Sequence, residues 1–343
     1  MKKNYLYSIE NLRGLAILLV FFTHCSSFSQ FSPIISEFLR FIVGNATTIF
    51  VFISGFLFHY LQSKKKFKYF NFLKQKLKFV GFPYLFFITV ATTLGVIFKI
   101  NESFSLSTLQ FYLWSLMVGG SIVGPLWFIP MIGLYFITAP LFLILSKLPY
   151  AIFSIITFSI VFLSLFTDRP FNQYNPFLSY IHFFGFYILG VYFSTFSQFR
   201  IKLLHNYKMV FFLTISVFIS LEILYLYNYN YNINQGFFAS LGKFNFIHAG
   251  KLCMTVFLFV AFERYINHKT KYLSYFSNIS FGIFFVHGFM LLIFSKLMNM
   301  FGGISDPILS LILETIIGLG GSVLVIYIGK KILGTRSRYV LGC

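Results

Sequence analysis

The most prominent pattern in this sequence is a series of long apolar segments separated by short polar ones. The apolar segment 104–118 is shorter than the others and ends at Gly119 and Gly120, so we interpret it as interfacial or re-entrant. The remaining pattern predicts an all-α, polytopic membrane bundle of about ten transmembrane helices. The segments long enough to cross a bilayer are residues 9–28, 41–61, 79–98, 126–145, 150–167, 179–196, 209–227, 246–262, 275–297 and 307–328.

The composition agrees with a protein embedded in a membrane. Of the 343 residues, 58% are hydrophobic and only 10% are charged, whereas about 25% of the residues of a soluble domain are charged. The longest polar stretches, 62–78 and 228–245, are too short to form a soluble domain. We therefore predict a single integral-membrane domain over residues 1–343, and the absence of a visible internal repeat does not favour an inverted-repeat transporter.

The positive charges are distributed unevenly among the loops. The net charge is +19, but the basic residues are scattered between apolar runs and do not form the continuous basic surface of a nucleic-acid-binding protein. If the amino terminus is cytoplasmic, three of the 27 Lys and Arg residues lie within spans, four fall outside the cell and the other 20 are cytoplasmic. Such a bias predicts that both termini are cytoplasmic and that the number of spans is even.

The first apolar segment carries ionisable residues, which are expensive within a bilayer and are therefore candidates for function. Arg13 and His24 are eleven residues apart, so a helix places them on one face, about 16 Å apart along its axis. A guanidinium suits phosphate or carboxylate, and an imidazole suits general-base chemistry. The alternatives are an Arg13 side chain that reaches the interface or pairs with Glu10, and a His24 satisfied by a neighbouring helix.

With this spacing of Arg13 and His24, the sequence resembles the acyltransferase 3 family of integral-membrane O-acyltransferases. Further segments resemble the second helix, the basic loop, the fourth helix and the penultimate segment of that family, in the family's order. They are FVFISGFL at 50–57, FLKQKLKFVGFPYLF at 72–86, PLWFIPMIGLYFITAPL at 125–141 and ISFGIFFVHGFML at 279–291. The resemblance implies a bacterial inner-membrane enzyme that moves an acetyl group from cytoplasmic acetyl-CoA to a hydroxyl of a cell-surface polysaccharide or its lipid-linked precursor.

The resemblance also implies roles for individual residues. His24 would be the general base, and Arg13 would assist catalysis and hold the pyrophosphate region of coenzyme A. The ordinary alternatives are close helix packing at the Ser-Gly step and, for the lysines, topology or contact with anionic lipid. The other candidates for donor binding are Ser54, Gly55, Lys74, Lys76 and Lys78, where the family usually has arginines at several of the lysine positions.

Trp127 and His287 are the candidates for binding the acceptor substrate. Trp127 lies at the outer end of its span, where an aromatic ring could stack on a sugar, although tryptophan is also an ordinary interfacial anchor. His287 lies near the middle of its span and could belong to a polar cavity beside His24 or be a satisfied bundle histidine. Glu222 and Glu314 are acids within apolar segments, and either could orient an imidazole.

We expect no metal cofactor, because the seven histidines include no close ligand pair and the three cysteines lack metal-ligand spacing. The expected partners are acetyl-CoA, a surface carbohydrate acceptor and the lipid bilayer, without nucleic acid, and a homo-oligomer is left open. The alternative function is a carbohydrate exporter or flippase that uses the same polar cavity without chemistry. Only the transferase would leave acetyl groups on the polymer.

Overall fold

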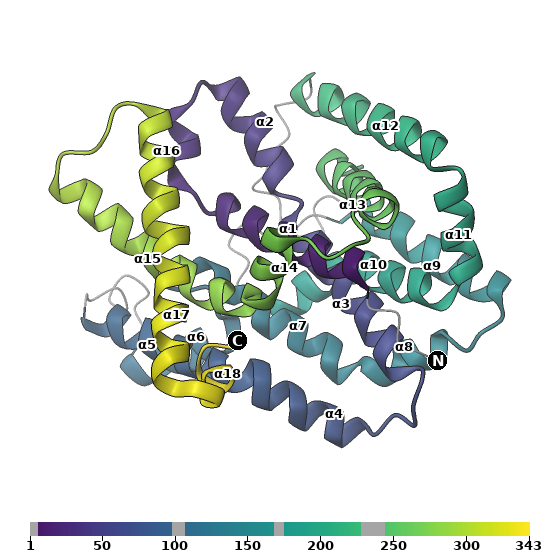
Figure 1. The fold of residues 1–343 in the computed structure, drawn as a ribbon, viewed down its shortest axis with the longest axis horizontal. Helices are drawn as coiled ribbons and strands as arrows, with labels where there is room; N and C mark the ends of the chain where they lie inside the picture. Colours follow the sequence, from purple (N-terminus) through teal and green to yellow (C-terminus); the bar gives the residue numbers. More distant parts are fainter. Residues whose placement is uncertain (1–5, 98–106, 168–174, 228–243) are drawn as a thin grey trace.

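The computed structural model describes residues 6–97, 107–167, 175–227 and 244–343. Every regular element in these ranges is a helix (Figure 1), which confirms the all-α membrane bundle predicted from the sequence. The helices are α1 (Tyr7–Thr23), η1 (Ser26–Gln30), α2 (Pro33–Val43), α3 (Ala46–Gln62), α4 (Tyr69–Lys76), η2 (Leu77–Gly81), α5 (Phe82–Ile97), α6 (Thr108–Val118), η4 (Gly124–Trp127), α7 (Phe128–Ile137), α8 (Ala139–Leu145), α9 (Tyr150–Ser164), α10 (Pro176–Thr195), α11 (Ser197–His205), α12 (Tyr207–Tyr227), α13 (Phe246–Tyr265), α14 (Lys271–Asn278), α15 (Ser280–Met300), α16 (Pro307–Thr315), η5 (Ile316–Gly320), α17 (Gly321–Leu333), η6 (Gly334–Arg336) and α18 (Ser337–Val340).

The helices long and apolar enough to cross a membrane number six in the described residues, or up to eight if each of two bent pairs is one span. Within the described residues, each of the ten expected segments is mostly helical. Two of these helices, α1 and α9, have only 17 and 15 residues, fewer than the about 20 of a typical span. The number of ten spans therefore remains a prediction. Helix α6 has 11 residues and is too short to cross a bilayer.

Some residues that support the predicted topology lie outside the described part of the chain. The side chain of Glu222, which was a candidate to orient an imidazole, also lies outside the described part of the chain. The orientation of the molecule relative to the two sides of a membrane therefore stays a prediction. The residues concerned are Lys2, Lys3, Lys99, Arg169, Lys243 and most of the segment 228–245.

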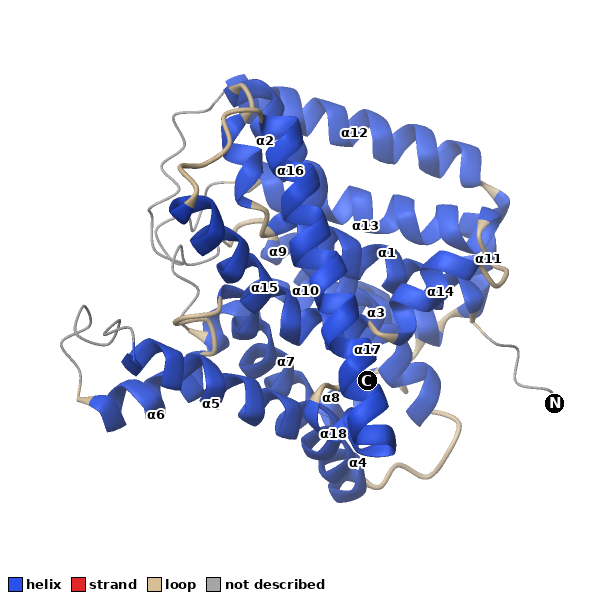
Figure 2. Ribbon diagram, turned by 60° about the vertical axis from the view of Figure 1, so that its left-hand side comes forward, coloured by secondary structure: helices blue, strands red, loops and turns tan. Residues whose placement is uncertain are grey.

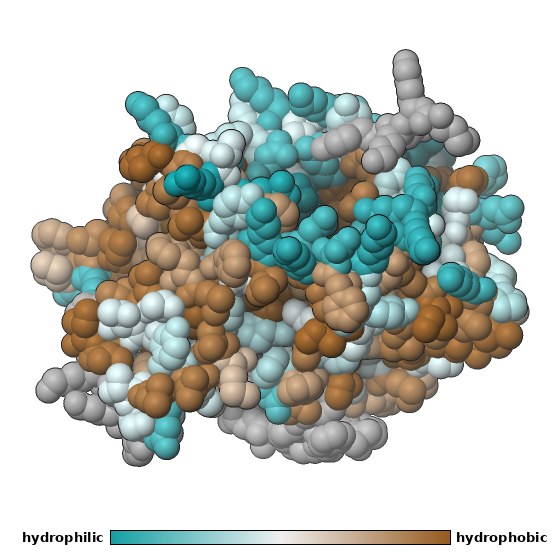
Figure 3. All heavy atoms as spheres, turned by 90° about the horizontal axis from the view of Figure 1, so that it is seen from below, coloured by the Kyte–Doolittle hydropathy of each residue, from teal (hydrophilic) through white to brown (hydrophobic). Residues whose placement is uncertain are grey.

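Large apolar side chains are exposed over much of the molecular surface. Phe162 on α9, Phe212 on α12 and Tyr327 on α17 are examples, with 58%, 71% and 64% of their surface exposed. Figure 3 shows hydrophilic side chains gathered across the upper part of one face, with hydrophobic side chains covering the sides. A soluble monomer rarely exposes so much apolar surface, so this surface fits contact with lipid chains.

Helix α1 lies at the centre of the bundle and packs against α3, α13, α14 and α15 (Figures 1 and 2). Beside it, α3 and α10 approach through two small residues. A Cβ atom at Gly55 would overlap the carbonyl oxygen of Tyr187, and one at Gly190 would overlap that of Phe52. Glycine lets the two helix backbones come this close, and the pair forms one wall of the bundle core.

The amino-terminal half of α1 is tied to the segment that leads into α14. The fully buried amide of Asn11 donates hydrogen bonds of 2.8 Å to the carbonyl oxygens of Ile266 and His268. A Cβ atom at Gly14 would overlap the carbonyl oxygen of Leu273. Because hydrogen bonds and the missing side chain both favour close approach, α1 and α14 lie backbone against backbone.

Candidate active site

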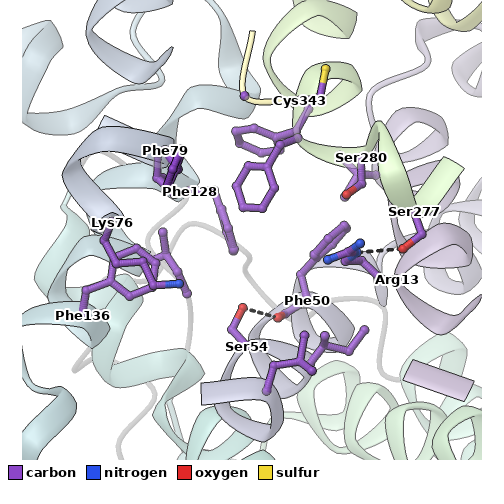
Figure 4. Close-up of a pocket in the computed structure, with 18 of the residues that line it drawn as sticks. Arg13, Phe50, Ser54, Lys76, Phe79, Phe128, Phe136, Ser277, Ser280 and Cys343 are labelled. Atoms are coloured by element: carbon purple, nitrogen blue, oxygen red, sulfur yellow. Dashed lines mark hydrogen bonds between the residues drawn. The ribbon is translucent and has the colours of Figure 1, made fainter. Parts of the chain in front are cut away.

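One cavity of about 610 Å³, which we call the central cavity, brings together six parts of the chain. Its lining comes from α1, from α3, from α4 with η2, from η4 with α7, from α14 with α15, and from the residues after α17. Its volume falls within the range of about 300–1,000 Å³ that is usual for small-molecule and cofactor sites. This is the candidate active site (Figure 4).

Arg13 and His24 both line the central cavity. Helix α1 continues from Tyr7 to Thr23 and His24 follows as its cap residue, so the spacing of eleven residues places both side chains toward the same space. The guanidinium Nε of Arg13 donates a 2.8 Å hydrogen bond to the hydroxyl of Ser277 on α14 (Figure 4). The close approach of α1 and α14 therefore fixes the direction of the Arg13 side chain.

The chain that follows His24 is held by Glu314 of α16. One carboxylate oxygen accepts from the amide of Ser26 at 2.8 Å and from its hydroxyl at 2.9 Å, and the other accepts from the amide of Ser27 at 3.0 Å. Only 1% of the surface of Glu314 is exposed. This buried carboxylate satisfies the start of η1 and so fixes the backbone two residues beyond His24.

His287, expected to bind the acceptor, is not among the residues that line the central cavity. It is fully buried in α15, and the centre of its ring lies 5.5 Å from that of His24. Its Nδ1 lies 2.8 Å from the carbonyl oxygen of Ile283. The structure therefore places His287 behind His24, one layer away from the space that a substrate would enter.

Ser54 and Gly55, both candidates for donor binding, face different neighbours. Ser54 lines the central cavity, and its hydroxyl donates a 2.8 Å hydrogen bond to the carbonyl oxygen of Phe50. Gly55 is buried against α10 and is not part of the lining. Adjacent helix residues point about 100° apart, so Ser54 remains a candidate for contact with the donor while Gly55 is a packing residue.

Of the three candidate lysines, only Lys76 lines the central cavity. Its ammonium lies 4.6 Å from the ring centre of Phe136, and Figure 4 shows Lys76 and Arg13 extending from opposite walls. Lys74 and Lys78 are exposed and lie outside the lining. Residues two apart on a helix do not share a face, so these lysines could not all point into one cavity.

The segment after α17 contributes a cation that sequence reasoning missed. Arg338 lines the central cavity, and its guanidinium carbon lies 4.1 Å from the ring centre of Phe79 on η2. That ring in turn stacks on Tyr339, with centres 5.7 Å apart. In the sequence, Arg338 belongs to a basic group near the end of the chain, with Lys330, Lys331 and Arg336, and such a group indicates membrane topology only.

Cys343 also lines the central cavity, which raises the question of whether it could act as a nucleophile. Burial raises the pKa of the Cys343 thiol. The thiolate, not the thiol, is the reactive form, so the burial of Cys343 disfavours attack on a thioester. His24 is therefore the better candidate for the reacting group.

Trp127 lines the central cavity from the turn that opens α7. Its ring stacks on Phe183 of α10, with centres 6.0 Å apart. The neighbouring ring of Phe128 lines the cavity too, so this wall is aromatic. An aromatic wall of this kind offers a stacking surface to a sugar ring.

The electrostatic character of the central cavity is positive. Three cationic side chains line it, and the described residues of the lining include no aspartate or glutamate. Neutral polar groups complete the lining. The cations are Arg13, Lys76 and Arg338, and the neutral polar side chains include Gln62, Gln75, Asn278 and Ser280.

A comparison with known protein families matches residues 6–330 to the model of acyltransferase 3, described as an acyltransferase domain. The matched stretch contains every wall of the central cavity except the segment that carries Arg338 and Cys343. Comparisons with curated proteins and with solved structures gave no significant match.

Proposed function

The chain belongs to the acyltransferase 3 family, and from this premise we propose that it is a membrane O-acetyltransferase. Membership supports acyl transfer by a multi-pass membrane protein. The proposed donor is acetyl-CoA on the cytoplasmic side, and the proposed acceptor is a hydroxyl of a cell-surface polysaccharide or its lipid-linked precursor. The proposed location is the bacterial inner membrane.

The observation that carries this proposal is that one cavity joins the imidazole of His24 to three cationic side chains. Coenzyme A carries several phosphate groups, which bind well to guanidinium and ammonium groups. Arg13, Lys76 and Arg338 supply such groups. Arg13 and His24 are about 16 Å apart along α1. This distance gives an extended pantetheine arm room to carry its thioester from the phosphate-binding end of the cavity to His24.

In the proposed reaction, the acceptor hydroxyl attacks the thioester carbonyl carbon while His24 takes the hydroxyl proton. The new C–O ester bond forms as the C–S bond breaks. The coenzyme A thiolate leaves and takes the proton back from His24. An acyl-imidazole intermediate on His24 is the second route that the same residue could serve.

The test compares surface glycans from cells with and without this chain by mass spectrometry, looking for the mass increment of an acetyl group. We expect His24→Ala to abolish O-acetylation while the protein still accumulates in the membrane. His205→Ala is the matched control, because His205 is an exposed histidine on α11 outside the cavity lining. Normal acetylation in His24→Ala would overturn the proposed role of this residue.

The same experiment separates the transferase from an exporter. Deletion of an exporter would stop delivery of the polymer and leave the acetyl content of the remaining polymer unchanged. Deletion of a transferase would leave polymer on the surface without its acetyl groups.

A further inference from the structure

We infer that His287 is a positioning residue that orients His24 and stabilises its protonated form during acyl transfer. This inference rests on the proposed function, because it gives a role to a residue behind the proposed general base. The observation behind it is a fully buried imidazole on α15 that lies beside His24 with one ring nitrogen bonded and the other unbonded.

The bonded nitrogen determines which tautomer His287 adopts. Its Nδ1 lies 2.8 Å from the carbonyl oxygen of Ile283. A carbonyl oxygen only accepts hydrogen bonds, so Nδ1 must carry the proton. In the neutral ring, Nε2 is then the nitrogen with a free lone pair and can act only as an acceptor.

The acceptor nitrogen of His287 has no hydrogen-bond partner among the described residues, although it is buried. Buried polar atoms seldom lack a partner. The rings of Phe21 and Phe284 lie 6.4 Å and 6.3 Å from His287, centre to centre, and offer no N–H group. Among the described rings in contact with His287, His24 is the one that can donate.

The geometry allows that donation. The two imidazole centres are 5.5 Å apart and their planes are inclined by 46°. A hydrogen bond needs about 2.7–3.2 Å between the two nitrogens, so donation requires the His24 ring to turn toward His287. His287 cannot make the same adjustment freely, because its Nδ1 is held by Ile283.

This arrangement is useful at one moment of the reaction. When His24 takes the proton of the acceptor hydroxyl, both of its ring nitrogens become donors. One faces the central cavity and the other can donate to Nε2 of His287. In a Ser-His-Asp triad a carboxylate plays this part; here a neutral imidazole would do so without burying a second charge, and His287 itself neither gains nor loses a proton.

The test uses three variants of the full-length protein in detergent or liposomes. His287→Phe keeps an aromatic ring but removes the acceptor, and we expect kcat to fall about 10–100-fold, the loss that is usual when a group that orients a metal-bound histidine is removed. The KM for acetyl-CoA should change by less than about twofold, because His287 lies outside the cavity lining. His287→Gln offers an amide oxygen near the Nε2 position and should restore most of kcat.

His59→Phe is the matched control. His59 is a buried histidine on α3 that bonds to Ser194 and is not part of the cavity lining. We expect this variant to alter thermal stability at most, with kcat unchanged. An equal fall of kcat in His59→Phe and His287→Phe would attribute the loss to general damage and overturn the inference.

A second readout does not depend on activity. Diethyl pyrocarbonate modifies unprotonated imidazole nitrogens, and mass spectrometry can follow its addition to His24. If His287 holds the N–H of His24, the lone pair of His24 faces the cavity, and His287→Phe should slow this modification several-fold while His287→Gln should not. Unchanged modification together with full kcat in His287→Phe would overturn the inference even where His24→Ala is inactive as proposed. Should the wild type prove unable to transfer acetyl groups, the modification rates alone would decide.

Discussion

Arg13 is held in place by one neighbour and presented to the central cavity at the same time. Its Nε donates to Ser277, and the side chain lines the central cavity. A lysine at this position would keep the charge but lose the planar fork. The hydrogen bond to Ser277 thus serves to aim the group rather than to neutralise it.

We predict that Arg13→Ala chiefly weakens use of the donor. A hydrogen bond to a charged group contributes about 1.5–3 kcal/mol, so kcat/KM for acetyl-CoA should fall about 10–100-fold. The kcat/KM of Arg13→Lys for acetyl-CoA should lie between the values of the wild type and of Arg13→Ala. Saturation curves with acetyl-CoA check this, and an unchanged dependence on acetyl-CoA would remove the proposed phosphate-binding role of Arg13.

The lysines around η2 provide a comparison within one short segment. We predict that Lys76→Gln raises the KM for acetyl-CoA about tenfold, or about 1.4 kcal/mol, because its ammonium lines the central cavity. Lys74→Gln and Lys78→Gln remove the same charge from exposed positions and should leave KM within about twofold, since exposed charges are screened by salt. Equal effects of all three variants would mean that only the overall charge of this segment matters.

At the scale of whole elements, the contact between α1 and α14 determines where Arg13 lies. Asn11 illustrates this: besides the two carbonyl groups that it binds, its side-chain oxygen accepts a 2.7 Å hydrogen bond from the hydroxyl of Thr270. A buried asparagine with its amide and its oxygen both bonded allows one relative position of the two segments. The direction of Arg13 follows from that position.

We predict that Gly14→Ala destabilises the protein by about 1–3 kcal/mol, the usual range for overpacking. The added Cβ atom would overlap the backbone of Leu273, which cannot move without shifting α14. Thermal unfolding of the purified protein measures the effect, and acetyl transfer should fall along with the melting temperature.

Gly133→Ala is the matched control for this substitution. Gly133 lies within α7, and a Cβ atom there meets no other atom within 4 Å. Alanine favours a helix by up to about 1 kcal/mol over glycine, so the control should be neutral or slightly stabilising. If the two variants unfolded at the same temperature, close approach of α1 and α14 would not be what glycine provides at position 14.

At the scale of the whole molecule, the charge distribution gives a direction to the central cavity. The charge bias among the loops predicts that the segment 62–78 and the residues after α17 face the cytoplasm. Lys76 and Arg338 belong to these segments, so the cation-rich end of the cavity would open toward the compartment that holds acetyl-CoA. The acceptor would then approach His24 from the other side.

We predict the following labelling pattern for single-cysteine variants in intact cells, after Cys25, Cys253 and Cys343 are replaced by serine. Ser305→Cys, in the exposed connection between α15 and α16, should react with a membrane-impermeant maleimide. Lys66→Cys, in the connection between α3 and α4, should react only after the membrane is permeabilised. The reverse pattern would contradict the predicted topology and place the cations on the wrong side for a cytoplasmic donor.

Much of this molecule could be predicted because the signals concerned are local. Apolar length and helix period depend on neighbouring residues only, so they were sufficient for the all-α bundle and for the shared face of Arg13 and His24. The same applies to the resemblance of the motif that contains them, which the match over residues 6–330 supports. Ser54, Lys76 and Trp127 were candidates from the sequence and do line the central cavity.

Other features depended on which helices lie against each other, and this is decided by packing between segments far apart in the chain. Lys76, but not Lys74 or Lys78, turns inward because of where α4 lies. Arg338 joins Lys76 because α18 folds back onto η2 and α5. His287 is 263 residues from His24 in the sequence, yet its ring lies beside it because α15 packs on α1. The sequence alone determined what kind of helices form and which chemical groups they carry. Only the tertiary structure decided which of those groups share a cavity, because close packing selects one relative placement of the helices, and the patterns of the individual helices leave that placement open.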